Sequence, residues 1–156
     1  QNGFYNCDIT RTLPVDGVYT QRQRQLVELV IEVQQEAIRL LRPGIEHRQW
    51  NEEVNAFYRE RLKERRIIET DEELERVYYH RIGHHLGLDT HDECLVSQSI
   101  EEGMVFTVEP GLYLVDEGLG IRIEDDVLVR TGENELLSSE IPKTPGQIEE
   151  LMAGLR

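Results

Sequence analysis

Four of the chain's five histidines lie in the stretch from His80 to Asp92. A neutral imidazole near pH 7 can bind a metal ion or carry a proton, so this stretch could do either kind of chemistry. A helix here would contain Gly83 and Gly87, which both weaken helices. We therefore expect an extended or looping path, with glycines where the backbone approaches another group closely. A histidine-rich surface loop would show the same pattern.

Three carboxylates lie in segments whose composition otherwise indicates β-strands: Asp8, Glu109 and Glu124. Singly, each is best explained as a surface or salt-bridged acid, because a buried carboxylate is costly unless it is paired or bound to a metal. Together, near one histidine stretch, they would repel each other without a cation. Oxygen ligands with one imidazole suit Mn²⁺, Co²⁺, Fe²⁺ or Zn²⁺. We therefore predict a shared metal site.

The elements that position these acids can be predicted from local patterns. Three segments rich in aromatic and β-branched residues are predicted as strands: 4–12, 104–109 and 119–130. Side chains alternate across a strand, so Asp8 shares a face with Thr10, and Glu124 shares one with Arg122 and Asp126. Alternation would therefore fix the face of the strand on which each acid lies.

Helices are predicted from apolar residues at helical spacing. A Thr-x-x-Gln box at Thr20 and Gln23 begins the first helix, and Pro43 followed by Gly44 ends it. Further helices are predicted over residues 47–65 and 145–152, with a short helical turn over 71–77. His47 is expected to be exposed near the start of its helix.

Composition excludes several classes of function. With 17 basic and 31 acidic residues, the net charge is −14, which disfavours binding to nucleic acid and to anionic membranes. No apolar run is long enough to span a membrane. Two cysteines form no disulfide framework, and we expect a cytoplasmic protein. The 156 residues are sufficient for one domain with a core.

Four blocks of residues, in this order, carry a resemblance to a known family: 8–12 (Asp-Ile-Thr-Arg-Thr), 80–92, 108–113 (Val-Glu-Pro-Gly-Leu-Tyr) and 121–126 (Ile-Arg-Ile-Glu-Asp-Asp). They resemble the signature blocks of the proline-specific metallopeptidases aminopeptidase P (Xaa-Pro aminopeptidase) and prolidase. The ending over residues 141–149 is more similar to aminopeptidase P. The resemblance implies the pita-bread fold, an α+β fold with a curved antiparallel sheet and helices packed on its outer face.

The resemblance also implies a metal-dependent exopeptidase that hydrolyses Xaa-Pro peptide bonds by a metal-bound hydroxide. Asp8 and Glu124 would bridge two metals, while His84 and Glu109 would be further ligands. The family implies Mn²⁺ most often, with Co²⁺ or Zn²⁺ as alternatives. The substrate would be a peptide with proline in the second position.

Three more residues receive roles by the same resemblance. His80 and His91 would sit beside the metals, contact substrate and steer protons. Arg122 would orient the region around Glu124 or take part in the hydrogen-bond network there. Glu109 would also take part in proton transfer, so His80, His91, Glu109 and Arg122 form the predicted catalytic set.

The chain departs from the family pattern before Asp8. The family has a further metal-binding Asp about a dozen residues upstream, whereas seven residues precede Asp8 here. We therefore expect residues 1–156 to be the C-terminal part of a catalytic domain whose N-terminal part is absent. Such a chain would bind at most one divalent ion tightly and be a poor peptidase alone. Exposed strand edges would favour a homodimer.

Other functions remain open at this point. The chain could be a peptide- or protein-binding module on a decayed peptidase scaffold, which the missing Asp favours and the retained ligands oppose. It could also be a prolidase that cleaves Xaa-Pro dipeptides. A metal-free hydrolase of the creatinase type would not need the acidic ligand set, and methionine aminopeptidase fits the three histidines less well.

Overall fold

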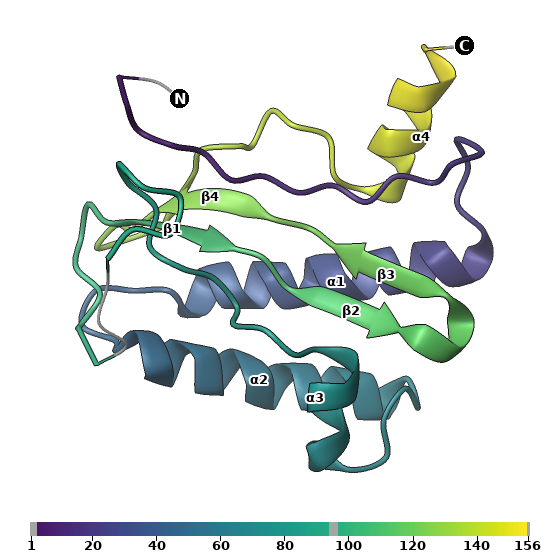
Figure 1. The fold of residues 1–156 in the computed structure, drawn as a ribbon, viewed down its shortest axis with the longest axis horizontal. Coiled ribbons are helices and arrows are strands. Elements are labelled where there is room, and N and C mark those ends of the chain that lie inside the picture. Colours follow the sequence, from purple (N-terminus) through teal and green to yellow (C-terminus); the bar gives the residue numbers. More distant parts are fainter. Residues whose placement is uncertain (1–2, 94–96, 156) are drawn as a thin grey trace.

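Two long helices lie side by side next to the strands in the computed structural model, which describes residues 3–93 and 97–155 (Figure 1). Helix α1 spans Gln21–Leu40 and helix α2 spans His47–Glu64. Helix α1 contacts α2 on one side and strands β1, β2 and β3 on another. The shared core of the molecule therefore lies between the helices and the strands.

Both helices begin and end where the sequence predicts. The Thr20 side chain accepts the backbone N–H of Gln23, and the Gln23 side chain accepts the backbone N–H of Thr20, which completes the capping box. Helix α2 buries a stripe at helical spacing: His47, Trp50, Val54, Tyr58 and Leu62. The expectation that His47 is exposed is wrong. The residue is 4 % exposed and its Nε2 lies 2.9 Å from the carbonyl oxygen of Gly83, so it belongs to the core.

The remaining helices are short. A 3₁₀ turn over Asp71–Glu73 leads into helix α3, Leu74–Val77, where a helical turn is predicted. A second 3₁₀ turn, η2, spans Val115–Glu117. Helix α4, Pro145–Ala153, begins with a capping box between Thr144 and Gln147. Proline at the first helical position suits this start, because that N–H would have no partner inside the helix.

The strands form two antiparallel groups that follow one another along a long hairpin. Strand β1, Val105–Val108, pairs with β4, Asp125–Leu128, which also pairs with the short β5, Glu135–Leu136. Strand β2, Gly111–Leu114, pairs with β3, Leu119–Arg122. Gly118 follows η2 in the left-handed region, at φ 63°, and lets the chain turn back into β3.

The prediction of one strand over residues 119–130 is wrong in one respect, because the chain breaks it between β3 and β4. The break lies at Ile123 and Glu124, opposite Glu109 and Pro110. Proline has no N–H to donate to a ladder, so pairing stops where Pro110 enters it. Glu109 and Glu124 therefore face each other across an irregular step in the hairpin.

The predicted strand over residues 4–12 is also wrong. This segment runs extended along the strands (Figure 1), but its pairing with β-structure there is an isolated bridge between Thr10 and Glu124. The backbone N–H of each residue donates to the carbonyl oxygen of the other, at 3.4 and 3.0 Å. Other hydrogen bonds also hold the segment, such as that from the Asn6 N–H to the Gly87 carbonyl at 2.9 Å and that from the Arg122 N–H to Thr12 Oγ1 at 3.0 Å, but they do not build a ladder.

The fold is α+β, as predicted, with an apolar core between α1, α2 and the strands. Trp50 and Phe106 meet edge to face in it, with ring centroids 5.9 Å apart. In the described part of the chain, no helix is long and apolar enough to cross a membrane.

Candidate metal centre

Residues from distant parts of the sequence converge at the step in the hairpin. Ligand atoms of Asp8, His84 and Glu124 all lie within 4.8 Å of one another. The Nε2 atom of His84 lies 3.7 Å from Asp8 Oδ2 and 3.7 Å from Glu109 Oε1. The four predicted metal ligands thus surround one small space, with the imidazole among three carboxylates.

The loop over residues 80–92 presents His84 to this space. The backbone N–H of His84 donates to Thr107 Oγ1 at 3.0 Å, and the N–H of Thr107 donates to the carbonyl oxygen of His84 at 2.9 Å. A Cβ on Gly83 would lie 1.9 Å from the carbonyl oxygen of Thr107, so only glycine allows this approach. The prediction of a looping path with glycines at close approaches is confirmed.

The protonation of the His84 ring suits a ligand. Its Nδ1 lies 3.1 Å from the carbonyl oxygen of His85, which can only accept a hydrogen bond. Nδ1 therefore carries a proton, so the neutral ring has its lone pair on Nε2, the nitrogen that faces the carboxylates. A metal-binding histidine is usually oriented by such a bond from its other nitrogen.

The side chains of Glu109 and Glu124 are shielded from solvent. The Thr10 hydroxyl donates to Glu124 Oε2. Burial raises the pKa of Glu109 to about 7, and the charges of Glu124 and Asp8 add to this effect while Arg122 opposes it. Burial also raises the pKa of Glu124, with Asp8 again contributing. The acids repel one another as the structure stands, and a divalent cation would relieve that repulsion. The donor set and its electrostatics therefore fit a metal ion.

Asp126 is a member of this cluster to which the sequence assigned no role. It is 4 % exposed, and both of its carboxylate oxygens lie 3.3 Å from the backbone N of Asp8. Burial raises its pKa to about 6, despite that N–H, and the charges of Glu124 and Asp8 raise it further. Alternation along the strand already placed Asp126 on the Glu124 face, which was the available signal.

The other predicted residues surround the cluster in different ways. The ring centroid of His91 lies 4.2 Å from that of His84. His80 is held by Tyr113: its Nδ1 faces the carbonyl of Arg81 at 2.8 Å, so its Nε2 accepts the Tyr113 hydroxyl proton at 2.8 Å. Burial lowers the pKa of His80 and favours this neutral ring.

Arg122 lies on the exposed side of β3. Its positive charge lowers the pKa of both Glu109 and Glu124, against the effect of burial. It therefore acts on the two glutamates electrostatically, and the role of orienting that region stays a prediction.

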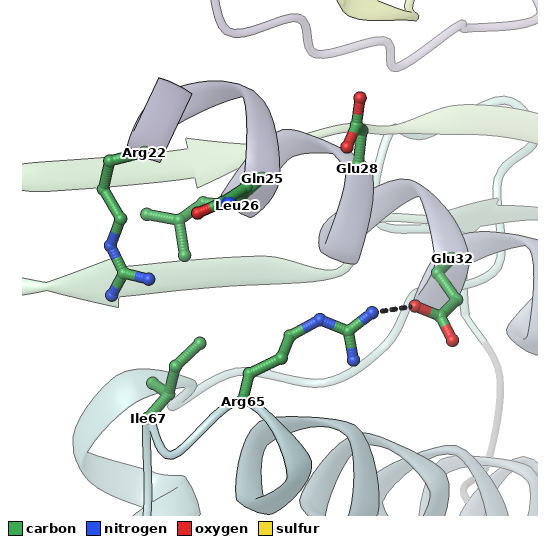
Figure 2. A pocket seen from close by; sticks show the side chains of 7 residues that line it. All are labelled: Arg22, Gln25, Leu26, Glu28, Glu32, Arg65 and Ile67. Carbon is green, nitrogen blue, oxygen red and sulfur yellow. Dashed lines mark hydrogen bonds and ion pairs between the residues drawn. The ribbon is translucent and has the colours of Figure 1, made fainter. Parts of the chain in front are cut away.

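A separate pocket of about 400 Å³ lies between α1 and the turn after α2 (Figure 2). An ion pair crosses it, from Arg65 to Glu32 at 2.6 Å. Its lining contains no predicted site residue: Arg22, Gln25, Leu26, Glu28, Glu32, Arg65 and Ile67. The candidate chemistry therefore lies elsewhere, at the hairpin step.

The α+β fold and this oxygen-rich centre with one imidazole define a scaffold of the metallopeptidase class. The model of metallopeptidase family M24 matches residues 2–131, and the chain belongs to that family. The Xaa-Pro aminopeptidase 1 of Streptomyces coelicolor is 37 % identical over 98 % of this chain and 36 % of its own length. The Xaa-Pro aminopeptidase of Haemophilus influenzae is 39 % identical over 96 % of this chain and 39 % of its own.

Solved structures agree with this assignment. Zinc-substituted Escherichia coli aminopeptidase P, in complex with product, superposes with a TM-score of 0.87 at 37 % identity, over 98 % of this chain and 39 % of that one. A substituted form of the same enzyme, in complex with substrate, gives a TM-score of 0.86. The likeness confirms the pita-bread type of fold. The chain spans less than two-fifths of the length of these relatives.

Proposed function

We propose that this chain carries the metal-binding part of an exopeptidase that hydrolyses Xaa-Pro bonds, of the aminopeptidase P kind. The observation that carries this proposal is the convergence of Asp8, His84, Glu109 and Glu124 on one space, with a lone pair of His84 aimed into it. We further propose that residues 1–156 correspond to the C-terminal part of the catalytic domain of the relatives.

The residues could divide the chemistry between them. Divalent ions held by Asp8, His84 and the two glutamates would lower the pKa of water and polarise a peptide carbonyl. Glu109 would accept a proton from the attacking water and later release it. His91, beside His84, would hold the substrate carbonyl by a hydrogen bond.

His80 would act near the leaving group of the substrate, and Arg122 on the two glutamates. A neutral His80 accepts the Tyr113 hydroxyl at Nε2 and would hold that hydroxyl in place, while the proton for the leaving nitrogen would be the one that Glu109 takes from the attacking water. The prolyl nitrogen of the substrate bears no hydrogen in the peptide, so it must receive one when the bond breaks. Arg122 would keep both glutamates available as anions.

The proposal makes two statements about the metal. By resemblance Mn²⁺ is the expected ion, with Co²⁺ or Zn²⁺ as alternatives, and this chain is expected to hold one ion tightly.

Self-association as a homodimer stays a prediction from the sequence.

Calorimetric titration of the purified protein with Mn²⁺ tests the metal centre. We expect one tight site, its loss in Asp8→Asn and Glu124→Gln, and unchanged binding in Asp116→Asn, which removes an exposed acid from η2. An absence of Mn²⁺, Co²⁺ and Zn²⁺ binding in the unsubstituted protein would contradict the proposal, and two tight sites would contradict the single-ion prediction.

Peptide hydrolysis tests the substrate class. Metal-dependent release of the first residue from an Xaa-Pro-containing tripeptide, and its absence with alanine in place of proline, is expected where the full catalytic domain is present. Cleavage confined to Xaa-Pro dipeptides would indicate a prolidase. Peptide binding without cleavage, in a metal-loaded protein, would favour the binding module.

A further inference from the structure

A glutamine is buried in the apolar face of α1, directly behind the hairpin step. Gln34 is 0 % exposed, and its side-chain Nε2 donates to the carbonyl oxygens of Val108 and Ile123 at 3.1 and 3.2 Å. These two residues immediately precede Glu109 and Glu124 in the sequence. One amide group therefore ties together the two chain segments that present the paired glutamates.

Backbone pairing is weakest at this point of the hairpin. The N–H of Glu109 donates to Ile82 at 2.8 Å, and that of Glu124 donates to Thr10 at 3.0 Å, so both bonds lead away from the opposite strand. Across the step, Ile123 donates to Pro110 at a long 3.4 Å. Because Pro110 has no N–H to return this bond, the pairing beside the two glutamates is incomplete, and Gln34 adds two hydrogen bonds there.

Lys143 holds the amide of Gln34 in one orientation. Its Nζ donates to Gln34 Oε1 at 2.9 Å and to Asp125 Oδ2 at 2.8 Å. An ammonium group can only donate, so Oε1 must face it and Nε2 must face the carbonyls. The amide cannot rotate to the reversed arrangement without losing all three of its bonds.

Asp125 anchors Lys143 in turn. Its carboxylate is fully buried and also accepts hydrogen bonds from Arg11 at 2.7 Å and Ser138 at 2.5 Å. Asp125 follows Glu124, and alternation along the strand sends the two side chains to opposite faces. The ligand cluster thus lies on one face of β4, with a satisfied polar network on the other.

We propose that Gln34, held by Lys143, is a positioning residue that sets the spacing of the Glu109 and Glu124 carboxylates for metal binding. The proposal rests on the proposed metal centre. A purely stabilising role would also satisfy two buried carbonyls, since an unpaired buried carbonyl is costly. The two roles differ in one respect: a positioning residue changes the affinity and geometry of bound metal in molecules that remain folded.

The chain offers a matched control. The side-chain amide of Asn134 likewise donates to two backbone carbonyls, those of Ile38 and Leu41, at 2.9 and 2.6 Å, but at the far end of α1. Asn134→Ala and Gln34→Leu therefore remove the same kind of contact, one remote from the carboxylates and one behind them. Lys143→Met keeps Gln34 but frees its amide.

The test measures Mn²⁺ affinity by calorimetry, the electron paramagnetic resonance spectrum of bound Mn²⁺, and urea unfolding, on the same purified proteins. We expect Gln34→Leu to weaken Mn²⁺ binding about tenfold and to alter the spectrum, and Lys143→Met to act in the same direction. Asn134→Ala should lower the urea midpoint but leave affinity and spectrum unchanged.

The outcomes separate the two proposals. If the unsubstituted protein binds Mn²⁺ and Gln34→Leu, folded by circular dichroism, binds it equally well, the positioning role is refuted while the metal centre stands. If Gln34→Leu does not fold, Lys143→Met decides: unchanged affinity and spectrum refute the role. If the unsubstituted protein binds no metal, the proposed function itself fails.

Discussion

Replacing Glu109 with glutamine should stabilise the metal-free protein at neutral and alkaline pH. Burial and two neighbouring acids raise the pKa of Glu109 from its usual 4.5 to about 7. Above pH 7 the carboxylate is ionised in an environment that disfavours the charge. A glutamine side chain at this position would have nearly the same shape with no charge to bury, so Glu109→Gln removes the penalty.

The size and sign of this effect on the free energy of unfolding follow from the difference between the pKa of Glu109 in the folded and the unfolded chain. In the unfolded chain Glu109 titrates near 4.5, so between pH 4.5 and about 7 the folded state binds more protons than the unfolded state. Its contribution to stability is complete below pH 4.5 and is lost as the pH rises through 7. The difference corresponds to about 3 kcal/mol, because a tenfold change in the protonation equilibrium is worth about 1.4 kcal/mol. The side chain is only 16 % exposed, so solvent screens this value little.

The assay is urea unfolding in the presence of a chelator at pH 4.5 and at pH 8. We expect the free energy of unfolding of Glu109→Gln to exceed that of the unsubstituted protein by up to about 3 kcal/mol at pH 8. At pH 4.5 the two free energies should be equal. Glu102→Gln is the control: hydrogen bonds from Thr131 lower the pKa of this exposed acid, so its removal should not stabilise the fold at pH 8. A metal-free Glu109→Gln that is no more stable than the unsubstituted protein at pH 8 would refute the reasoning.

Three further outcomes are expected. Mn²⁺ affinity should rise with pH through about 7, because Glu109 must lose its proton to bind; calorimetry at pH 6 and 8 measures this. Gly83→Ala should weaken Mn²⁺ binding and lower the free energy of unfolding by about 2 kcal/mol or more, because the new Cβ would meet the Thr107 carbonyl at 1.9 Å and displace His84. Arg22→Gln should change that free energy by less than about 1 kcal/mol in urea unfolding, because its ion pair with Glu117 is solvent-exposed.

Local signals in the sequence were sufficient for the helices and for the location of the centre. Capping residues such as Thr20 act within one turn, so their effect can be read without knowledge of the rest of the fold. The unusual placement of acids in apolar segments identified Asp8, Glu109 and Glu124, because burial of a charge requires a partner wherever the segment lies. The structure brings all three to His84, although their roles as ligands stay predictions.

Non-local pairing explains what the sequence did not show. Residues 4–12 have strand-like composition, but a strand also needs a partner along its length, and the bridge of Thr10 to Glu124 does not extend. The burial of His47 depends on a carbonyl of Gly83, far away in the chain. Gln34 gave no signal either, because one polar residue in an apolar helical pattern is ordinary until its partners are known.

The interruption at Pro110 links the fold to the chemistry. The N–H groups of Glu109 and Glu124 point away from the opposite strand, as that of Thr107 also does, and donate to Ile82 and Thr10. Those two bonds fasten the histidine loop and the N-terminal segment to the hairpin, and these segments bring His84 and Asp8 to the cluster. These outward bonds of the hairpin therefore bring together four predicted ligands from four parts of the chain. Where Pro110 interrupts the ladder, the Ile123 N–H reaches the Pro110 carbonyl only at 3.4 Å, and the buried amide of Gln34 joins the two segments that carry the glutamates.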